Sequence, residues 1–286
     1  MERKEDKKKV VEDFYHYTTQ DTLCCMLNKY RESIYPEKLI FWASSIFTMN
    51  NPQEMNHGVE VFMTLIAFNE NFYKIPQEDR LNIESFNSQK ILFIHPNTSF
   101  VISFSRNRDD LAMWSLYGDG GQGVVLKFNK DLESCPSDLT RVTKPENVYY
   151  GDGTDKMQLL YRIYNDGLKE LRQCTNEDQR RACREKTLSK LYVHICPFIK
   201  TEAYKMENES RLSYYNIPYC LFKFRTRNKN VIPYIEVPIP VKYLEEILFG
   251  PCCNYELALH SIRYLLDCCE LQCVNISKSS IPYRNI

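Results

Sequence analysis

The chain has 286 residues, which is enough for one large domain or two small ones with a substantial core. Hydrophobic residues make up 43% and charged residues 26%, so the composition excludes a disordered chain. The 37 lysines and arginines balance 37 aspartates and glutamates. This balance excludes a global field that would draw the protein onto nucleic acid or an anionic membrane, so such a partner has to be bound by a local patch.

The absence of a secretory signal and of Cys-x-x-Cys pairs indicates where the protein is located and the redox state of its cysteines. Residues 1–11 are charged and carry no apolar core of a secretory signal, and no later stretch has the length of a membrane span. We therefore expect a cytoplasmic protein with no membrane partner. The twelve cysteines include no Cys-x-x-Cys pair, which favours free thiols and predicts no metal site.

The first third of the chain predicts strands and helices in alternation. Leu23, Met26 and Leu27 have the spacing of one buried helix face. We predict a strand at 14–18 that ends in a helix cap, a strand at 39–43, a polar turn at 50–52, a helix at 59–69 and a short helical hairpin within 70–98.

The segment 100–128 carries the largest number of secondary-structure patterns for its length. Residues 100–105 alternate as a strand does, 109–117 have helical spacing, and 124–128 form a further strand. Gly118, Gly120, Gly121 and Gly123 lie between them. Backbone N–H groups of such a run can cradle a phosphate, but neither a helix start nor Lys-Ser/Thr follows as in a P-loop. A tight turn is the preferred interpretation.

The second half predicts amphipathic helices within 155–190 and a segment after Pro197 that passes from helix into strand. In a strand, Glu207, Glu209 and Arg211 share one face. From spacing alone, a salt-bridged, solvent-facing strand edge is the favoured explanation of these charges. The end of the chain predicts a strand, a Gly250-Pro251 turn, a helix at 254–270 and a strand near 274–276.

These elements lack the regular strand–helix–strand spacing of a doubly wound sheet, so the predicted fold class is α+β. No Gly/Pro/Ser-rich linker divides the chain. We therefore predict a charged N-terminal segment at 1–13 and a single domain over 14–286.

Several short motifs follow one another along nearly the whole chain. They are Tyr-His-Tyr-Thr at 15–18, Asn-Asn-Pro-Gln-Glu at 50–54, Ile-Ser-Phe-Ser at 102–105, Met-Trp-Ser-Leu-Tyr-Gly at 113–118 with Gly123, Lys200, Glu-x-Glu-x-Arg at 207–211, residues 247–250 and Ser-Ile-Pro-Tyr-Arg at 280–284. In this order they resemble the bacterial family known as domain of unknown function 2971. Two positions depart from the family pattern: Tyr204 stands where a tryptophan is expected, and Asn51 where an aspartate is expected, so a role that needs a carboxylate at position 51 is in doubt.

A second resemblance concerns the ADP-ribosyltransferase superfamily. The order of a His-Tyr-Thr strand, a Ser-x-Ser strand and a Glu-x-Glu strand is similar to the core of those enzymes, and the opening is also similar to transferases that modify DNA or RNA ends. This is analogy at the level of the fold. It implies a split, mostly antiparallel sheet packed with helices, NAD as the substrate, and transfer of ADP-ribose to a macromolecule or hydrolysis of NAD.

The resemblance also implies roles for individual residues. Cleavage of the bond between nicotinamide and ribose creates a cationic sugar, as in glycoside hydrolysis, and a carboxylate is needed beside it. Glu209 would stabilise that charge and Glu207 would orient or deprotonate the acceptor. The residues implied to contact NAD are His16, Tyr17, Thr18, Ser103, Ser105, Arg106, Trp114, Tyr117 and Arg211.

Each of these residues also has a purely structural interpretation. His16 would be a hydrogen-bonded core residue, Trp114 would pack in the core, and Ser103 and Ser105 would satisfy backbone groups. Two further functions therefore stay open: a non-catalytic module that binds a nucleotide or a partner, and, in third place, a metal-dependent nuclease. The acceptor, protein or nucleic acid, and the oligomeric state are not determined by the sequence, although a role in bacterial conflict or phage defence would suit the family.

Overall fold

The computed structural model describes residues 13–32, 37–49, 54–81, 99–134, 144–151, 157–227 and 229–283. Within these ranges no helix is both long and apolar enough to cross a membrane. The expected charged segment at 1–13, the turn at 50–52 and most of the hairpin within 70–98 lie outside the described residues.

The chain divides into two compact units, which we describe separately. The first unit comprises Met1–Ile40, Phe104–Pro136 and Pro238–Ile286, and the second comprises Phe41–Ser103 and Ser137–Val237. The dividing points at 40/41, 103/104 and 237/238 fall within strands. The single domain over 14–286 stays a prediction.

The first unit contains a mostly antiparallel sheet whose strands follow the order β12-β11-β4-β1. Its strands are β1 (Phe14–Thr18), β4 (Val124–Phe128), β11 (Leu244–Phe249) and β12 (Asn275–Lys278). β12 pairs parallel to β11, the other pairs are antiparallel, and β1 also pairs with the end of β3 (Phe100–Ser105) through Tyr15 and Ser105. The predicted strands at 14–18, 100–105, 124–128 and 274–276 are confirmed.

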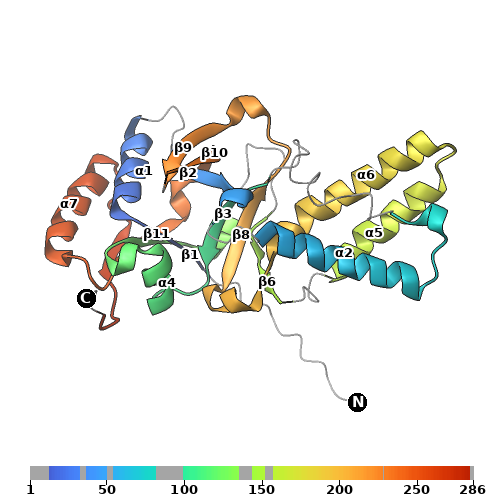
Figure 1. Ribbon diagram of the computed structural model, residues 1–286. Coiled ribbons are helices and arrows are strands. Elements are labelled where there is room, and N and C mark those ends of the chain that lie inside the picture. Colours follow the sequence, from blue (N-terminus) through green and yellow to red (C-terminus); the bar gives the residue numbers. More distant parts are fainter. Residues whose placement is uncertain are drawn as a thin grey trace, which may run out of the picture. The chain divides into compact units, whose positions relative to one another are not determined.

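Two helices of the first unit lie side by side in Figure 1, α1 (Gln20–Glu32) and α7 (Tyr255–Cys268). Leu23, Met26 and Leu27 of α1 are buried, as their spacing predicts. The Sγ atom of Cys269, just after α7, lies 3.6 Å from the backbone oxygen of Leu27.

The glycine-rich segment is a turn, as predicted, and it connects the short helix α4 (Leu111–Tyr117) to β4. A Cβ atom at Gly123 would lie 2.3 Å from the backbone oxygen of Thr18, a distance that no real Cβ atom shows. The amide of Gly123 donates to the oxygen of Gly118 at 2.8 Å. Close approach of backbone to backbone, and not phosphate binding, therefore explains this glycine.

The second unit packs three helices around one apolar core: α2 (Glu54–Phe72), α5 (Met157–Arg172) and α6 (Glu177–His194). The helix predicted at 59–69 is longer than expected, and the helices predicted within 155–190 are confirmed. Phe62 and Ile66 of α2, Tyr164 of α5 and Leu191 of α6 are fully or almost fully buried in this core.

The strand pairing in the second unit determines where the Glu-x-Glu-x-Arg motif lies. β3 pairs with β2 (Lys38–Ser45) and with β8 (Glu209–Tyr214), and β8 pairs on its other side with β5 (Glu146–Asn147). β6 (Tyr149–Tyr150) and β7 (Ile199–Lys200) form a parallel pair, and β9 (Lys223–Arg227) forms an antiparallel hairpin with β10 (Asn230–Pro240). The fold class is α+β with mostly antiparallel strand pairing, as predicted.

Candidate functional site

The Glu-x-Glu-x-Arg motif is buried, which corrects the expectation of a solvent-facing strand edge. β8 has strands on both sides, and all six of its residues are buried. Arg211 has no exposed surface, and Glu209 is 6% exposed. Glu207 precedes the strand: it closes a 3₁₀ turn, and the left-handed Asn208 (φ 44°) separates it from β8. Only Glu209 and Arg211 therefore share a strand face.

Arg211 and Glu209 form a bidentate ion pair. The Nε atom of Arg211 donates to Oε1 of Glu209 at 2.7 Å, and Nη2 donates to Oε2 at 2.8 Å. The remaining terminal nitrogen, Nη1, donates to the backbone oxygen of Pro197 at 2.6 Å. Two parallel hydrogen bonds from a planar guanidinium fix the carboxylate in orientation as well as position.

Lys200 of β7 joins the second carboxylate to the first. Its Nζ atom lies 2.5 Å from Oε2 of Glu207 and 3.3 Å from Oε2 of Glu209. The same ammonium lies 4.6 Å from the centre of the Tyr204 ring. The site thus holds two carboxylates and two cations, which we call the β8 charge cluster: Lys200, Glu207, Glu209 and Arg211.

Ionisation of Glu209 is governed by opposing effects. Burial by itself would raise the pKa of Glu209, but attraction to Arg211 and Lys200, together with hydrogen bonds from Arg211 and Ser103, lowers that pKa to about 2. The carboxylate is therefore charged at neutral pH although it is almost entirely removed from water.

The backbone around Glu209 is also held in place. Its amide donates to the hydroxyl of Tyr150 at 2.8 Å, and burial raises the pKa of that tyrosine, which keeps the hydroxyl neutral. The neighbouring Ser210 hydroxyl lies 2.5 Å from Oδ1 of Asn147 in β5. Neither Tyr150 nor Asn147 was among the residues predicted from the sequence, and no spacing signal points to them.

Lys200 was recognised in the sequence only as a family match and not as a site residue. The parallel pairing of β6 with β7 brings it next to the acidic pair. Its position seven residues before Glu207 gives no hint of contact in itself. The family motif was the one signal that would have found it.

Ser103 donates a hydrogen bond to Glu209 within the second unit, whereas the other hydroxyl of the Ser-Phe-Ser strand has a local partner. The Oγ atom of Ser105 accepts a hydrogen bond from the Asn107 amide at 3.0 Å, and Ser105 is 2% exposed. This contact agrees with the structural interpretation of Ser105.

Tyr17 and Trp114 pack against each other in the core of the first unit, with ring centres 5.1 Å apart at 74°. Trp114 has no exposed surface, and its Nε1 atom donates to Oδ1 of Asp109 at 2.7 Å. The Tyr17 hydroxyl donates to the backbone oxygen of Asn107 at 3.0 Å and accepts from the Asp110 amide at 3.2 Å. This burial favours core packing over stacking on a ligand.

The remaining predicted site residues of the first unit contact other side chains of that unit or are buried in it. His16 is half-buried with its ring edge-on to Phe104, at 5.8 Å between centres. The Arg106 guanidinium lies 3.8 Å from the centre of the Phe14 ring, and its Nη2 atom lies 3.6 Å from Glu133. Thr18 is buried and Tyr117 is half-buried against the Tyr17 and Trp114 cluster.

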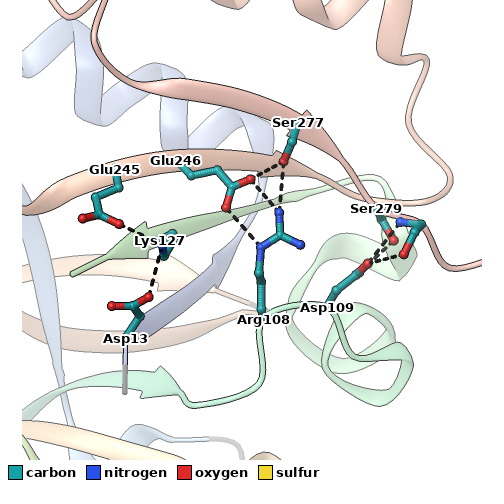
Figure 2. A network of polar contacts seen from close by, with 9 residues as sticks. Asp13, Arg108, Asp109, Lys127, Glu245, Glu246, Ser277 and Ser279 are labelled. Atoms are coloured by element: carbon teal, nitrogen blue, oxygen red, sulfur yellow. Dashed lines mark hydrogen bonds and ion pairs between the residues drawn. The ribbon is translucent and has the colours of Figure 1, made fainter. Parts of the chain in front are cut away.

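A polar network on the first unit was not predicted, and Figure 2 shows it. Asp109 accepts hydrogen bonds from the Ser279 hydroxyl at 2.7 Å and from the Ser280 amide at 3.1 Å, besides the one from Trp114. Arg108 meets Glu246 with two hydrogen bonds of 2.6 and 3.1 Å. These contacts tie the loop after β3 to the chain after β12, so they explain why the Met-Trp motif and the Ser280 motif occur together.

His16 and Ser105 belong to the first unit, whereas Ser103, Glu207, Glu209 and Arg211 belong to the second. The convergence of His16 and Glu209 on one cleft therefore stays a prediction. Among the described residues, no group of three His, Cys, Asp or Glu side chains is placed to hold a metal ion.

Comparison with curated proteins and with solved structures finds no match to this chain. A comparison with protein families finds one that spans the Met-Trp motif, Lys200 and the Glu-x-Glu-x-Arg motif. Residues 113–212 match the family described as Protein of unknown function (DUF2971), which confirms the family resemblance that the motifs indicate.

Proposed function

We propose that the protein is an NAD-dependent ADP-ribosyltransferase, or an NAD glycohydrolase where water replaces the acceptor, and that Glu209 is its central carboxylate. The observation that carries this proposal is the fixed negative charge of Glu209, which is buried, ionised and held by Arg211 and Lys200. A charged group whose surroundings do not have to reorganise during the reaction stabilises a transition state of opposite charge most effectively.

The reaction breaks the bond between C1′ of the ribose and the nicotinamide nitrogen, and nicotinamide leaves with the bonding electron pair. C1′ then carries positive charge until a lone pair of the acceptor, or of water, forms the new bond. Glu209 would face this cationic sugar. Glu207, held by Lys200, would orient the acceptor and take up its proton, and it would then release that proton to water.

Binding of the substrate has to respect the hydrogen bonds that Glu209 already accepts. Its two oxygens receive donors from Nε and Nη2 of Arg211, from Lys200 and from Ser103, and a carboxylate accepts about four in all. A ribose 2′-hydroxyl would therefore take the place of the Ser103 hydroxyl, one neutral O–H donor for another.

The test is release of nicotinamide from NAD by the purified protein and by the Glu209→Gln variant. Loss of the charge is expected to raise the barrier by about 3 kcal/mol, which corresponds to a rate about a hundredfold lower. Thermal melts establish that the variants are folded. Glu209→Asp is the second variant, because it keeps the charge but withdraws the carboxylate by one methylene, and it is also expected to be slow.

The matched control is Glu185→Gln, which removes an exposed carboxylate that pairs with Arg181 on the surface of α6. Nicotinamide release by this control is expected to equal that of the wild type. A folded Glu209→Gln variant with wild-type release would remove Glu209 from the mechanism.

The second candidate function is a non-catalytic module that binds a nucleotide or a partner. The specific observation in its favour is the occupancy of Glu209, because the carboxylate already accepts about as many hydrogen bonds as it can. Under this alternative the β8 charge cluster only holds the fold, the wild-type protein releases no nicotinamide with any candidate acceptor, and Glu209→Gln lowers stability.

A further inference from the structure

The hairpin of β9 and β10 concentrates positive charge in a chain that is neutral overall. Residues 213–235 contain four cations and no aspartate or glutamate. Lys223, Arg225 and Arg227 occupy alternate positions of β9, so their side chains leave the same face of the strand. Lys229 is exposed just before β10. In Figure 1 β9, β10 and β2 are labelled next to one another.

In the part of the chain that the structure describes, Arg225 is held in place by a hydroxyl and two aromatic rings and has no counter-ion. Its Nη2 atom donates to the Ser44 hydroxyl at 2.9 Å, and its guanidinium lies 5.4 Å from the centre of the Trp42 ring and 5.9 Å from that of Tyr234. Its Nε atom is buried and has no hydrogen-bond partner in the described part of the chain. Two aromatic rings and a hydroxyl thus orient the guanidinium of Arg225.

Repulsion from the neighbouring Arg227 makes the binding of an anion at Arg225 more favourable. Burial lowers the pKa of Arg225, and repulsion from Arg227 lowers it further. Within the described ranges neither arginine has a carboxylate at ion-pair distance, whereas the neighbouring Lys223 is 2.7 Å from Glu236. Two like charges side by side with no anion between them are stabilised when an anionic group binds.

Exposed aromatic side chains lie on the same hairpin and on the turn before it. Phe224 of β9 is 64% exposed and Tyr219 is 57% exposed. Phe224 points to the face opposite the three cations, because side chains alternate along a strand. Among the described residues β9 is the last strand in the order of its sheet, so a single strand lying along this edge would meet the cations on one face and the Phe224 ring on the other. Proteins hold single strands with phosphates on cations and bases stacked on aromatic rings.

We propose that the β9–β10 hairpin binds single-stranded nucleic acid, with the phosphates on Arg225 and Arg227 and unpaired bases on Phe224 and Tyr219. The residues of the hairpin that the proposal uses, and the turn before it, all lie within the second unit. Binding goes beyond the proposed function and is measured without NAD, so its outcome is separate from that of the nicotinamide-release assay. Were both proposals to hold, the bound strand would be the acceptor of ADP-ribose.

The test is fluorescence anisotropy of a labelled 20-nucleotide mixed-sequence DNA strand, an RNA strand of the same sequence and the corresponding DNA duplex, at several salt concentrations. The variant is Arg225→Gln with Arg227→Gln, and the matched control is Arg162→Gln with Lys190→Gln, two exposed cations of α5 and α6. Loss of two phosphate contacts is expected to reduce the slope of log affinity against log salt by about 1.4, hence to weaken binding about tenfold at 0.15 M salt.

A second variant separates stacking from charge. Phe224→Ala is expected to weaken binding of the single strands at least fivefold and to leave the salt slope unchanged. Equal loss in the control and in the arginine variant would overturn the proposal, as would tighter binding of the duplex than of either single strand. Binding to vesicles of anionic lipid, without binding to any of the oligonucleotides, would overturn it as well.

Discussion

The behaviour of Arg211 shows how much a single buried charge depends on its neighbours. All three nitrogens of its guanidinium donate hydrogen bonds, and the side chain has no contact with water. Removal of ions from water costs several kcal/mol each, and it is the pairing within the β8 charge cluster that offsets this cost. The cluster is therefore sensitive to loss of any one member.

We predict that Arg211→Leu lowers the free energy of unfolding by about 3 to 5 kcal/mol, because it leaves Glu209 buried without its main partner. The measurement is urea denaturation followed by circular dichroism. Arg181→Leu, which breaks an exposed pair with Glu185, is the control and is expected to change stability by less than about 0.5 kcal/mol. Similar stability of the two variants would contradict the prediction.

At the scale of elements, close backbone contact determines how the glycine turn joins α4 to β4. The amide of Gly250 donates to the oxygen of Gly123 at 3.0 Å, so the turn also meets the segment that follows β11. This contact places the end of α4, with its buried Trp114, beside β1 and β11.

We predict that Gly123→Ala destabilises the protein by about 1 to 3 kcal/mol, because the new Cβ atom would overlap the backbone oxygens of Thr18 and Gly118. Neither oxygen belongs to a flexible side chain that is able to move aside. A thermal melt measures the effect, and Ala112→Gly on the adjacent helix α4 is a reference for the loss of one methyl group. A melting temperature equal to that of the wild type would show that the backbone relaxes freely there.

At the scale of the whole molecule, the chain passes between its two units four times. Neither unit is a continuous piece of sequence, and three of the four passages lie within β2, β3 and β10. A cut at 103/104 or 136/137 therefore divides both units, whereas a cut at 40/41 or 237/238 divides only the first unit.

We predict that limited proteolysis does not yield two independently folded halves. Fragments from a tryptic cut after Arg141 would each contain parts of both units, so they are expected to stay associated or to unfold together. Size-exclusion chromatography with circular dichroism after partial trypsin digestion measures this. Two separable fragments, each with cooperative melting, would contradict the prediction of one domain.

The sequence by itself determined the fold class, most of the helices and strands, and the resemblance to one family over residues 113–212. These follow from local information: the alternation of residues 100–105, the spacing of Leu23, Met26 and Leu27, and motifs that stand in a fixed order. The Glu-x-Glu-x-Arg motif was found in the same way, including the pairing of its charges.

Only the tertiary structure decided whether those charges face water or the core. Period-two spacing places Glu209 and Arg211 on one face of a strand, but burial depends on β3 and β5, which flank β8 from distant parts of the chain. The same holds for Lys200, which reaches the acidic pair through β7. It also holds for Arg225, whose buried Nε atom has no hydrogen-bond partner among the described residues. Desolvation and ion pairing are set by neighbours in space, and a linear pattern does not specify these neighbours.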